Sequence, residues 1–196
     1  MQCKQRIVIG ISGASGAILG IELLKKLRLL EGWETHLILS SGARRTIQLE
    51  TAYTVAEVEL LADVVHPLGN IGASIASGTF RTAGMVIVPC SMKTLAGVAH
   101  GFSENLLLRA ADVTLKERRK LVLVPRETPF NLIHLRNMTS AAEAGAILLP
   151  PMLSFYQQPQ STEDLVAHIT GKILSMFDIE HPGFQRWCEQ ESAQLS

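Results

Sequence analysis

Short, continuously apolar runs alternate with helix-length segments along this chain of 196 residues. The runs lack the alternation of apolar and polar residues that a half-exposed strand shows, so they are typical of strands buried on both faces of a sheet. Strands that alternate with helices predict βαβ units, and therefore an α/β fold with a parallel sheet covered on both faces. The expected strands are residues 6–9, 34–39, 85–88, 121–124 and 146–149, and residues 64–66 form a short segment before a glycine-rich loop. The expected helices are residues 18–30, 43–50, 55–62, 92–99, 105–117, 131–143 and 162–177.

Composition favours one packed domain that associates with copies of itself. The length fits a single domain over residues 1–196, with a C-terminal arm from about residue 178. Hydrophobic residues make up 47% of the chain and charged residues 18%, and this low charged fraction predicts surface buried between subunits. Lys+Arg and Asp+Glu balance at 18 each, which leaves no footprint for nucleic acid or an anionic membrane.

The sequence shows no pattern typical of a membrane span, a secretion signal or a metal site. No apolar run is long enough to cross a membrane, and residues 1–6 lead straight into the first strand. Cys3, Cys90 and Cys188 are odd in number and widely spaced, which favours a reducing cytoplasm over a disulfide framework. The six histidines are scattered. We therefore expect a cytoplasmic protein that needs no metal.

A glycine-punctuated turn, residues 10–17, joins the first strand to the first helix. Such a turn directs backbone N–H groups and a helix N-terminus at a phosphate. A dinucleotide fingerprint would need the spacing G-x-G-x-x-G and an acidic residue about 20 residues further on. Here the glycines stand at 10, 13 and 16, and residues 40–42 read SSG where the acid would be. The turn predicts a phosphate site, and the missing acid argues against NAD.

Polar residues follow most of the predicted strands, at the edge where parallel sheets bind ligands. Four of these strand-end segments carry hydroxyl groups, and the remaining one carries the charges of Arg126 and Glu127. This convergence predicts a site at the carboxyl edge of the sheet. The segments are residues 13–15, 40–41, 89–94, 125–127 and 150–156.

Several residues near these ends have both a structural and a functional explanation. Ser91 is a good helix N-cap. Arg109, Asp112 and Lys116 stand at i, i+3 and i+7 on one helix face, where an ion pair of Asp112 with Arg109 or Lys116 is the default. Glu50 closes a predicted helix, which is the wrong end for stabilisation by the helix dipole.

Seven segments together resemble the flavin prenyltransferase family, known as UbiX and formerly described as phenylacrylic or 3-polyprenyl-4-hydroxybenzoate decarboxylases. The matching pieces extend from residue 7 to about 187 in the order and spacing of the family. Each is unspecific alone, and the combination is highly specific. The segments are ISGASGA (11–17), SGTF (77–80), PCSMKTL (89–95), RAADV (109–113), LKER (115–118), LVPRETP (123–129) and FY (155–156).

The resemblance implies a fold, an activity and partners. The fold is a three-layer, Rossmann-like (flavodoxin-like) parallel sheet with helices on both faces. The activity is a metal-independent transfer of a dimethylallyl group from dimethylallyl phosphate to N5 and then C6 of reduced FMN. The product, prenylated FMN, would serve a UbiD-type decarboxylase in ubiquinone biosynthesis or aromatic-acid decarboxylation. The family also forms dodecamers with active sites at subunit junctions, which would account for the low charged fraction.

Matched position by position, the resemblance assigns roles to individual residues. Lys172 stands where arginine is common, and Trp187 matches a C-terminal tryptophan that can close over the site. Residues 69–73 lack the aromatic wall that some members carry, so the preference for the prenyl substrate stays open. The FMN-binding positions are Gly13, Ala14, Ser15, Ser40, Ser91, Met92, Lys93, Thr94 and Arg126. The prenyl-phosphate positions are Arg109, Lys116, Tyr156 and Lys172. The catalytic positions are Ser15, Glu50, Lys116, Arg126 and Glu127, of which Ser15 and Glu50 would manage the N5 proton.

Three other functions stay open at the level of sequence. An FMN-dependent cysteine-type decarboxylase of related fold would carry a Pro-x-Met-Asn segment, whereas residues 150–153 read PPML. A non-catalytic flavin carrier subunit would have no need of the polar cluster around Arg109 and Lys116. An NAD-binding module would need an acid near Ser40.

Overall fold

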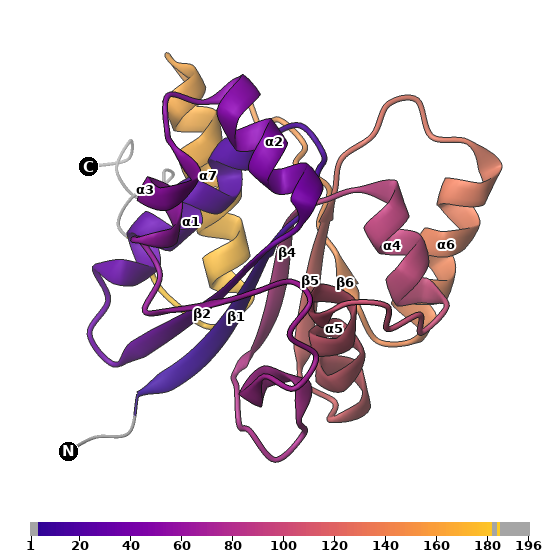
Figure 1. Cartoon of the computed structure of the whole chain (residues 1–196). Helices are drawn as coiled ribbons and strands as arrows, with labels where there is room; N and C mark the ends of the chain where they lie inside the picture. The colour runs from indigo at the N-terminus through magenta and orange to yellow at the C-terminus, as the bar shows by residue number, and fades with distance from the viewer. Residues whose placement is uncertain (1–3, 182–183, 185–196) are drawn as a thin grey trace. The chain divides into compact units, whose positions relative to one another are not determined.

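The computed structural model describes residues 4–181 and residue 184 and contains one six-stranded sheet (Figure 1). All neighbouring strands pair in parallel, in the order β3-β2-β1-β4-β5-β6. This order confirms the Rossmann-like α/β fold predicted from the sequence. The strands are β1 (Gln5–Ile11), β2 (Trp33–Leu39), β3 (Val64–His66), β4 (Gly84–Cys90), β5 (Lys120–Pro125) and β6 (Ile147–Leu148).

Helices connect the strands as the sequence predicts. The predicted helices 18–30, 55–62 and 162–177 end two or three residues early because their last residues form tighter i→i−3 bonds, as Leu30 N–H does to Leu27 O at 3.0 Å. The helices are α1 (Ala17–Arg28), α2 (Ser41–Glu50), α3 (Val55–Glu59), α4 (Met92–Ala99), α5 (Leu106–Lys116), α6 (Leu132–Glu143) and α7 (Thr162–Ser175), with a 3₁₀ turn η1 (Ser74–Ala76).

The chain divides into two compact units after Pro151. The first unit contains the whole sheet and the helices through α6, and the second contains α7. One domain over residues 1–196 with an arm from about residue 178 stays a prediction. No helix among the described residues is long and apolar enough to cross a membrane. Within the same residues, no three His, Cys, Asp or Glu side chains form a group that could hold a metal ion.

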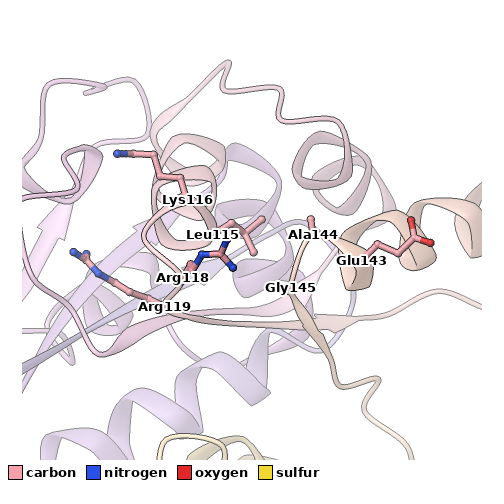
Figure 2. Close-up of a pocket in the computed structure, with 7 residues that line it drawn as sticks. All are labelled: Leu115, Lys116, Arg118, Arg119, Glu143, Ala144 and Gly145. Carbon is pink, nitrogen blue, oxygen red and sulfur yellow. The ribbon is translucent and has the colours of Figure 1, made fainter.

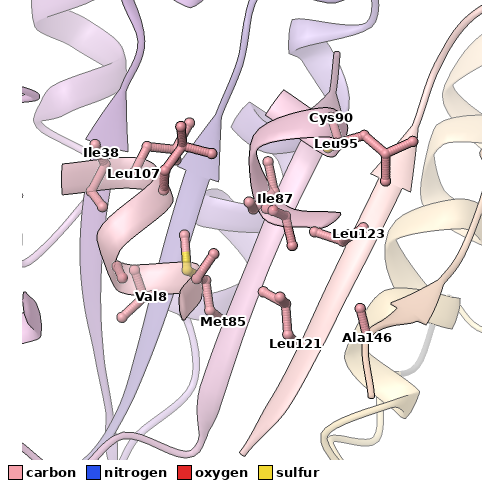
Figure 3. Close-up of a cluster of buried hydrophobic side chains, with 14 of the residues drawn as sticks. Val8, Ile38, Met85, Ile87, Cys90, Leu95, Leu107, Leu121, Leu123 and Ala146 are labelled. Carbon is pink, nitrogen blue, oxygen red and sulfur yellow. The ribbon is translucent and has the colours of Figure 1, made fainter. Parts of the chain in front are cut away.

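One face of the sheet packs against α5 (Figure 3). Val8, Met85 and Leu121 point from adjacent strands into this cluster, and Leu107 of α5 lies over them. Gly10 lets α5 approach, because a Cβ atom at that position would overlap the Leu107 side chain. The apolar strands and α5 therefore form one continuous core. This core holds β1 and β4 side by side, so their carboxyl ends lie next to each other.

Helix α1 packs on the opposite face at an unusually short distance. Ile7, Ile9 and Ile11 alternate with the residues that face α5, and all three are fully buried. A Cβ atom built at Gly20 of α1 would lie 2.7 Å from Val88 O and 2.7 Å from Ile11 Cδ1. The start of α1, which follows the glycine turn, is thus set directly by the ends of β1 and β4.

We expect Gly20→Ala to destabilise the protein although alanine is the better helix former. The clash with the Val88 carbonyl cannot be relieved by rotating a side chain, so overpacking of about 1–3 kcal/mol should exceed the gain in helix propensity of up to about 1 kcal/mol. Urea unfolding measures the difference. Gly69→Ala is the matched control, because a Cβ atom there would meet nothing within 4 Å. Equal stability of the two variants would contradict this close packing.

Candidate functional site

The loops after β1 and β4 are joined by one buried hydroxyl group. Ser12, 1% exposed, donates its Oγ–H to Pro89 O at 2.8 Å and accepts a bond from Ser91 N–H at 2.7 Å. Ser12 N–H also donates to Pro89 O at 3.2 Å. Because the chain leaves β1 and β4 toward opposite sides of the sheet, this junction is the switch point where ligands bind in such folds.

The loop after β2 contacts the glycine turn as well, on the side away from β4. Ser40 N–H donates to Ile11 O at 3.0 Å. Gly13 and Gly42 are in backbone contact, since a Cβ atom on either would lie 2.9 Å from the Cα atom of the other. Both positions therefore require glycine, and the exposed rim of the turn at this point consists of main chain.

Two helices start at this junction with a serine cap. Ser40 Oγ accepts from Ala43 N–H at 3.0 Å at the start of α2, and Ser91 Oγ accepts from Thr94 N–H at 3.3 Å at the start of α4. Thr94 is buried, and its hydroxyl lies 3.0 Å from Ser91 Oγ. The N–H groups of Met92 and Lys93 have no acceptor within the helix, so the start of α4 can bind an anion.

Glu50 lies at the start of α1 as well as at the end of α2. Its Oε2 atom accepts a bond from Gly16 N–H at 2.8 Å. Gly16, the N-cap of α1, has a φ of 104°, which glycine adopts without strain. The carboxylate is therefore favourably placed on the dipole of a neighbouring helix, although it stands at the wrong end of its own. It also lies beside Ser15, the residue before Gly16.

The pair Arg126-Glu127 follows β5 at the same edge of the sheet. Arg126 N–H donates to Cys90 O at 3.1 Å, which joins this loop to the end of β4. The Arg126 side chain is exposed, and Glu127 Oε1 accepts a bond from Thr128 N–H at 3.0 Å. Cys90 itself is fully buried, and burial raises the pKa of its thiol, so it is no nucleophile.

Lys116, the last residue of α5, lies at the opposite end of the sheet. Arg109 stands near the start of the same helix, beyond Leu107, whose side chain lies over Gly10. Helix α5 runs back toward β5, whose first residue Lys120 pairs with Gly84 at the start of β4. Strand β4 has seven residues, so about 20 Å separate its two ends. Within one chain, the structure therefore does not bring Lys116 together with Ser15, Glu50 and Arg126.

Each cation on α5 has an acidic partner. Arg109 forms the expected intrahelical ion pair with Asp112, at 2.7 Å, and its Nε–H donates to Ala76 O at 3.3 Å. Lys116 pairs with Glu117 at 2.8 Å, not with Asp112. The hydrogen bond and charge of Lys116 lower the pKa of the Glu117 carboxyl group. These contacts hold the charged groups of Arg109 and Lys116 in place on α5.

A cavity of about 460 Å³ lies beside Lys116. Figure 2 shows that Arg118 directs its charged end away from those of Lys116 and Arg119. Lys116 and Arg119 both reach the Glu117 carboxylate, at 2.8 Å and 4.0 Å. Arg119 also donates to Gly78 O at 2.6 Å and to Phe80 O at 2.8 Å. The lining residues are Leu115, Lys116, Arg118, Arg119, Glu143, Ala144 and Gly145.

The second unit carries Tyr156 and Lys172 around one histidine. The Tyr156 hydroxyl lies 3.5 Å from His168 Nε2, and the two rings meet edge to face. Lys172 stands one turn after His168 on α7, and burial together with the Lys172 charge lowers the pKa of His168. Trp187 lies outside the described residues.

Sequence reasoning missed four residues that hold these groups in place. The sequence places Ser12 in the glycine turn but does not reveal its hydrogen-bond partners, because they are 77 and 79 residues away. His168 could have been found from its i, i+4 spacing to Lys172. Glu117 and Arg119 follow Lys116 directly, but the carbonyl groups that Arg119 binds lie in a distant loop.

The chain matches known proteins over most of its length. Residues 1–174 match the family model described as Flavoprotein. Flavin prenyltransferase UbiX of Neisseria meningitidis is 55% identical over 93% of this chain and 96% of its own length. A dodecameric FMN-dependent UbiX-like decarboxylase from Escherichia coli superposes with a TM-score of 0.92 at 48% identity, covering 93% of this chain and 99% of that one. AnUbiX in complex with FMN and dimethylallyl pyrophosphate gives a TM-score of 0.92 at 49% identity, covering 94% and 97%. The chain belongs to the UbiX family of flavin prenyltransferases.

Proposed function

We propose that this protein joins the dimethylallyl group of dimethylallyl phosphate to N5 and C6 of reduced FMN. The observation that carries the proposal is the junction at the β1–β4 switch point, where a glycine turn free of side chains faces the start of α4. Family membership at more than 50% identity supports the same activity. The product would be prenylated FMN, and we propose a UbiD-type decarboxylase in the cytoplasm as its recipient.

The residues at the junction fit FMN. The free N–H groups at the start of α4 and the charge of Lys93 suit its phosphate. The backbone contact of Gly13 with Gly42 leaves main chain on the rim, so a flat ring system could approach closely. When bound and reduced, FMN supplies the electron-rich N5 and C6 atoms. The holding residues would be Gly13, Ala14, Ser15, Ser40, Ser91, Met92, Lys93, Thr94 and Arg126.

Glu50 and Ser15 are placed to handle a proton. Gly16 N–H fixes one carboxylate oxygen of Glu50 at 2.8 Å, which leaves the other oxygen available. The Ser15 side chain is half-exposed and forms no hydrogen bond with any described residue. We propose that the Ser15 hydroxyl passes a proton between the ligand and Glu50.

The remaining polar residues would stabilise the departing phosphate. Breaking an allylic C–O bond develops negative charge on the phosphate oxygens, and cations with hydroxyl donors lower the energy of that state. Glu127, the carboxylate beside Arg126, would set the position of the Arg126 guanidinium. The proposed phosphate-binding set is Arg109, Lys116, Arg126, Tyr156 and Lys172.

A second copy of the chain would bring the two ends of the sheet together. Lys116, which shares α5 with Arg109, lies about the length of β4, roughly 20 Å, from the FMN junction of its own chain, which is too far to act on a substrate bound there. We propose a homo-oligomer, as large as a dodecamer, in which these cations complete the site of a neighbouring subunit. The dodecameric Escherichia coli relative supports this arrangement.

The activity can be tested directly. Anaerobic incubation of the protein with reduced FMN and dimethylallyl phosphate should yield a flavin that is heavier by one five-carbon unit, measured by mass spectrometry of the released flavin. Omission of protein is the control. Unmodified flavin that stays tightly bound would favour the carrier function and contradict the transferase.

Glu50→Gln should reduce turnover by about 100-fold or more while FMN affinity stays the same. The amide oxygen can still accept the Gly16 bond, so the loop keeps its structure, but the amide cannot take up a proton. Single-turnover rates and FMN titration measure the two effects. Glu31→Gln changes an exposed acid elsewhere in the first unit and serves as the control. Full turnover in Glu50→Gln would exclude a proton-handling role.

Lys116→Ala should raise the KM for dimethylallyl phosphate by about tenfold or more with little change in FMN binding, because a phosphate loses a charged partner. Lys120→Ala, a nearby exposed lysine at the start of β5, is the control. Mixed oligomers of Lys116→Ala and Glu50→Gln provide a second readout. If each site takes these residues from different copies, the mixture should regain part of the activity that each variant lacks. No recovery after subunit exchange would contradict a shared site.

A further inference from the structure

A chain of polar side chains, half-buried at Arg6 and Glu34 and buried at His36 and His66, crosses β1, β2 and β3. Arg6 Nε–H donates to Glu34 Oε1 at 3.0 Å, and the same oxygen lies 2.8 Å from His36 Nε2. His36 Nδ1 lies 2.9 Å from His66 Nε2. His36 is 3% exposed and His66 8%, so these rings are polar groups within the core. None of the four residues belongs to the proposed FMN or phosphate set.

The charge of Glu34 fixes the direction of these bonds. Burial alone would raise the pKa of Glu34, but bonds from His36 and Arg6 lower it overall, so the carboxylate is charged. His36 Nε2 must therefore carry the hydrogen that Glu34 accepts, and His36 Nδ1 accepts from His66 Nε2–H. Burial and the neighbouring His36 lower the pKa of His66, which keeps this ring neutral at neutral pH.

His36 holds both ends of one loop. The β3–β4 segment, residues 67–80, begins directly after His66, whose ring stacks on His36 with centroids 5.2 Å apart. At the other end of the segment, Phe80 meets the same His36 ring edge-on at 5.3 Å. The Arg6 guanidinium covers Phe80 at 4.5 Å from the ring centroid. A single side chain thus contacts the residues that bound this segment.

The β3–β4 segment in turn holds α5 through its carbonyl groups. Leu68 O accepts from Leu106 N–H at 2.9 Å in the first turn of the helix. Ala76 O accepts from Arg109 Nε–H at 3.3 Å.

The segment also closes on the end of α5 that carries Lys116. Gly78 abuts Glu117, the ion-pair partner of Lys116, so closely that a Cβ atom on Gly78 would overlap the carboxylate. The neighbouring carbonyl groups of Gly78 and Phe80 receive the two Arg119 bonds. A shift of the segment would therefore move the groups around both Arg109 and Lys116.

We infer that His36 and His66 are positioning residues for the two cations of α5, and that they act through the β3–β4 segment. The inference rests on the proposed function in one respect: Arg109 and Lys116 are taken to bind the prenyl phosphate. Loss of the bond between the two imidazoles releases one end of the segment and leaves a buried acceptor, His36 Nδ1, without a donor.

The FMN junction lies at the same edge of the sheet, since His66 pairs with Ile38. It is held by contacts of its own, the Ser12 bonds and the Gly13–Gly42 packing, so it should be unaffected.

His66→Phe tests this because it keeps an aromatic ring in the stack and removes the hydrogen bond. The KM for dimethylallyl phosphate should rise about tenfold, as expected for a displaced contact group, while FMN affinity stays unchanged. His66→Gln should restore most of the loss, because its amide N–H can donate to His36 Nδ1. His100→Phe, an exposed histidine at the end of α4, is the matched control.

Hydrogen exchange of residues 67–80 gives a readout that is independent of activity. Faster exchange confined to this segment and α5 in His66→Phe, together with the KM effect, supports the inference. Phe80→Leu loosens the other end of the segment and should show the same pattern if His66→Phe does not fold. An unchanged KM, or an equal loss of FMN affinity, would overturn the inference. If the wild-type protein transfers no dimethylallyl group, the proposed function fails, and the exchange pattern alone decides whether the histidines hold the segment.

Discussion

The two hydrogen bonds of Ser12 are the constraint on which the carboxyl edge of the sheet depends. A hydroxyl group that is 1% exposed must find partners, and Ser12, just after β1, finds both of them at the end of β4, in Pro89 O and Ser91 N–H. These bonds hold the glycine turn beside the start of α4, while Gly13 packs on Gly42 at the start of α2. Three loops that are far apart in sequence therefore form one surface, and most of that surface is main chain and helix N-termini.

The direction of α5 places its last residues away from the ligand-binding edge of the same chain. A helix that connects two parallel strands must return to the amino edge of the sheet, so its last residues lie at the opposite end from the ligand-binding loops. Lys116 is the last residue of such a helix, whereas Glu50 and Ser15 stand at the carboxyl edge. The low charged fraction of the sequence agrees with surfaces that are covered by other copies.

The fold could be predicted from sequence more fully than the site. Buried strands such as β4 have an apolar pattern of their own, and the glycine turn marks the start of α1 without reference to any other segment. By contrast, Glu50 was expected at the unfavourable end of α2, and only the structure shows that its carboxylate caps a different helix. Ser12 and the pair His36–His66 likewise act through partners 30 or more residues away. Local pattern determines helices and strands, whereas these roles depend on how the sheet brings distant residues together.

The contact between Gly13 and Gly42 has a consequence for how this site can diversify. A side chain on Gly13 would overlap the backbone of Gly42, and a side chain on Gly42 would overlap the backbone of Gly13. Neither glycine can therefore be replaced alone. The rim they form has a fixed shape, and substitutions cannot adjust what it accepts. The cations of α5 and the hydroxyl groups of the second unit are side chains, and their size and charge can vary while the fold is kept. Under the proposed function, preference for the flavin would be built into the backbone, and preference for the transferred group would be left to side chains.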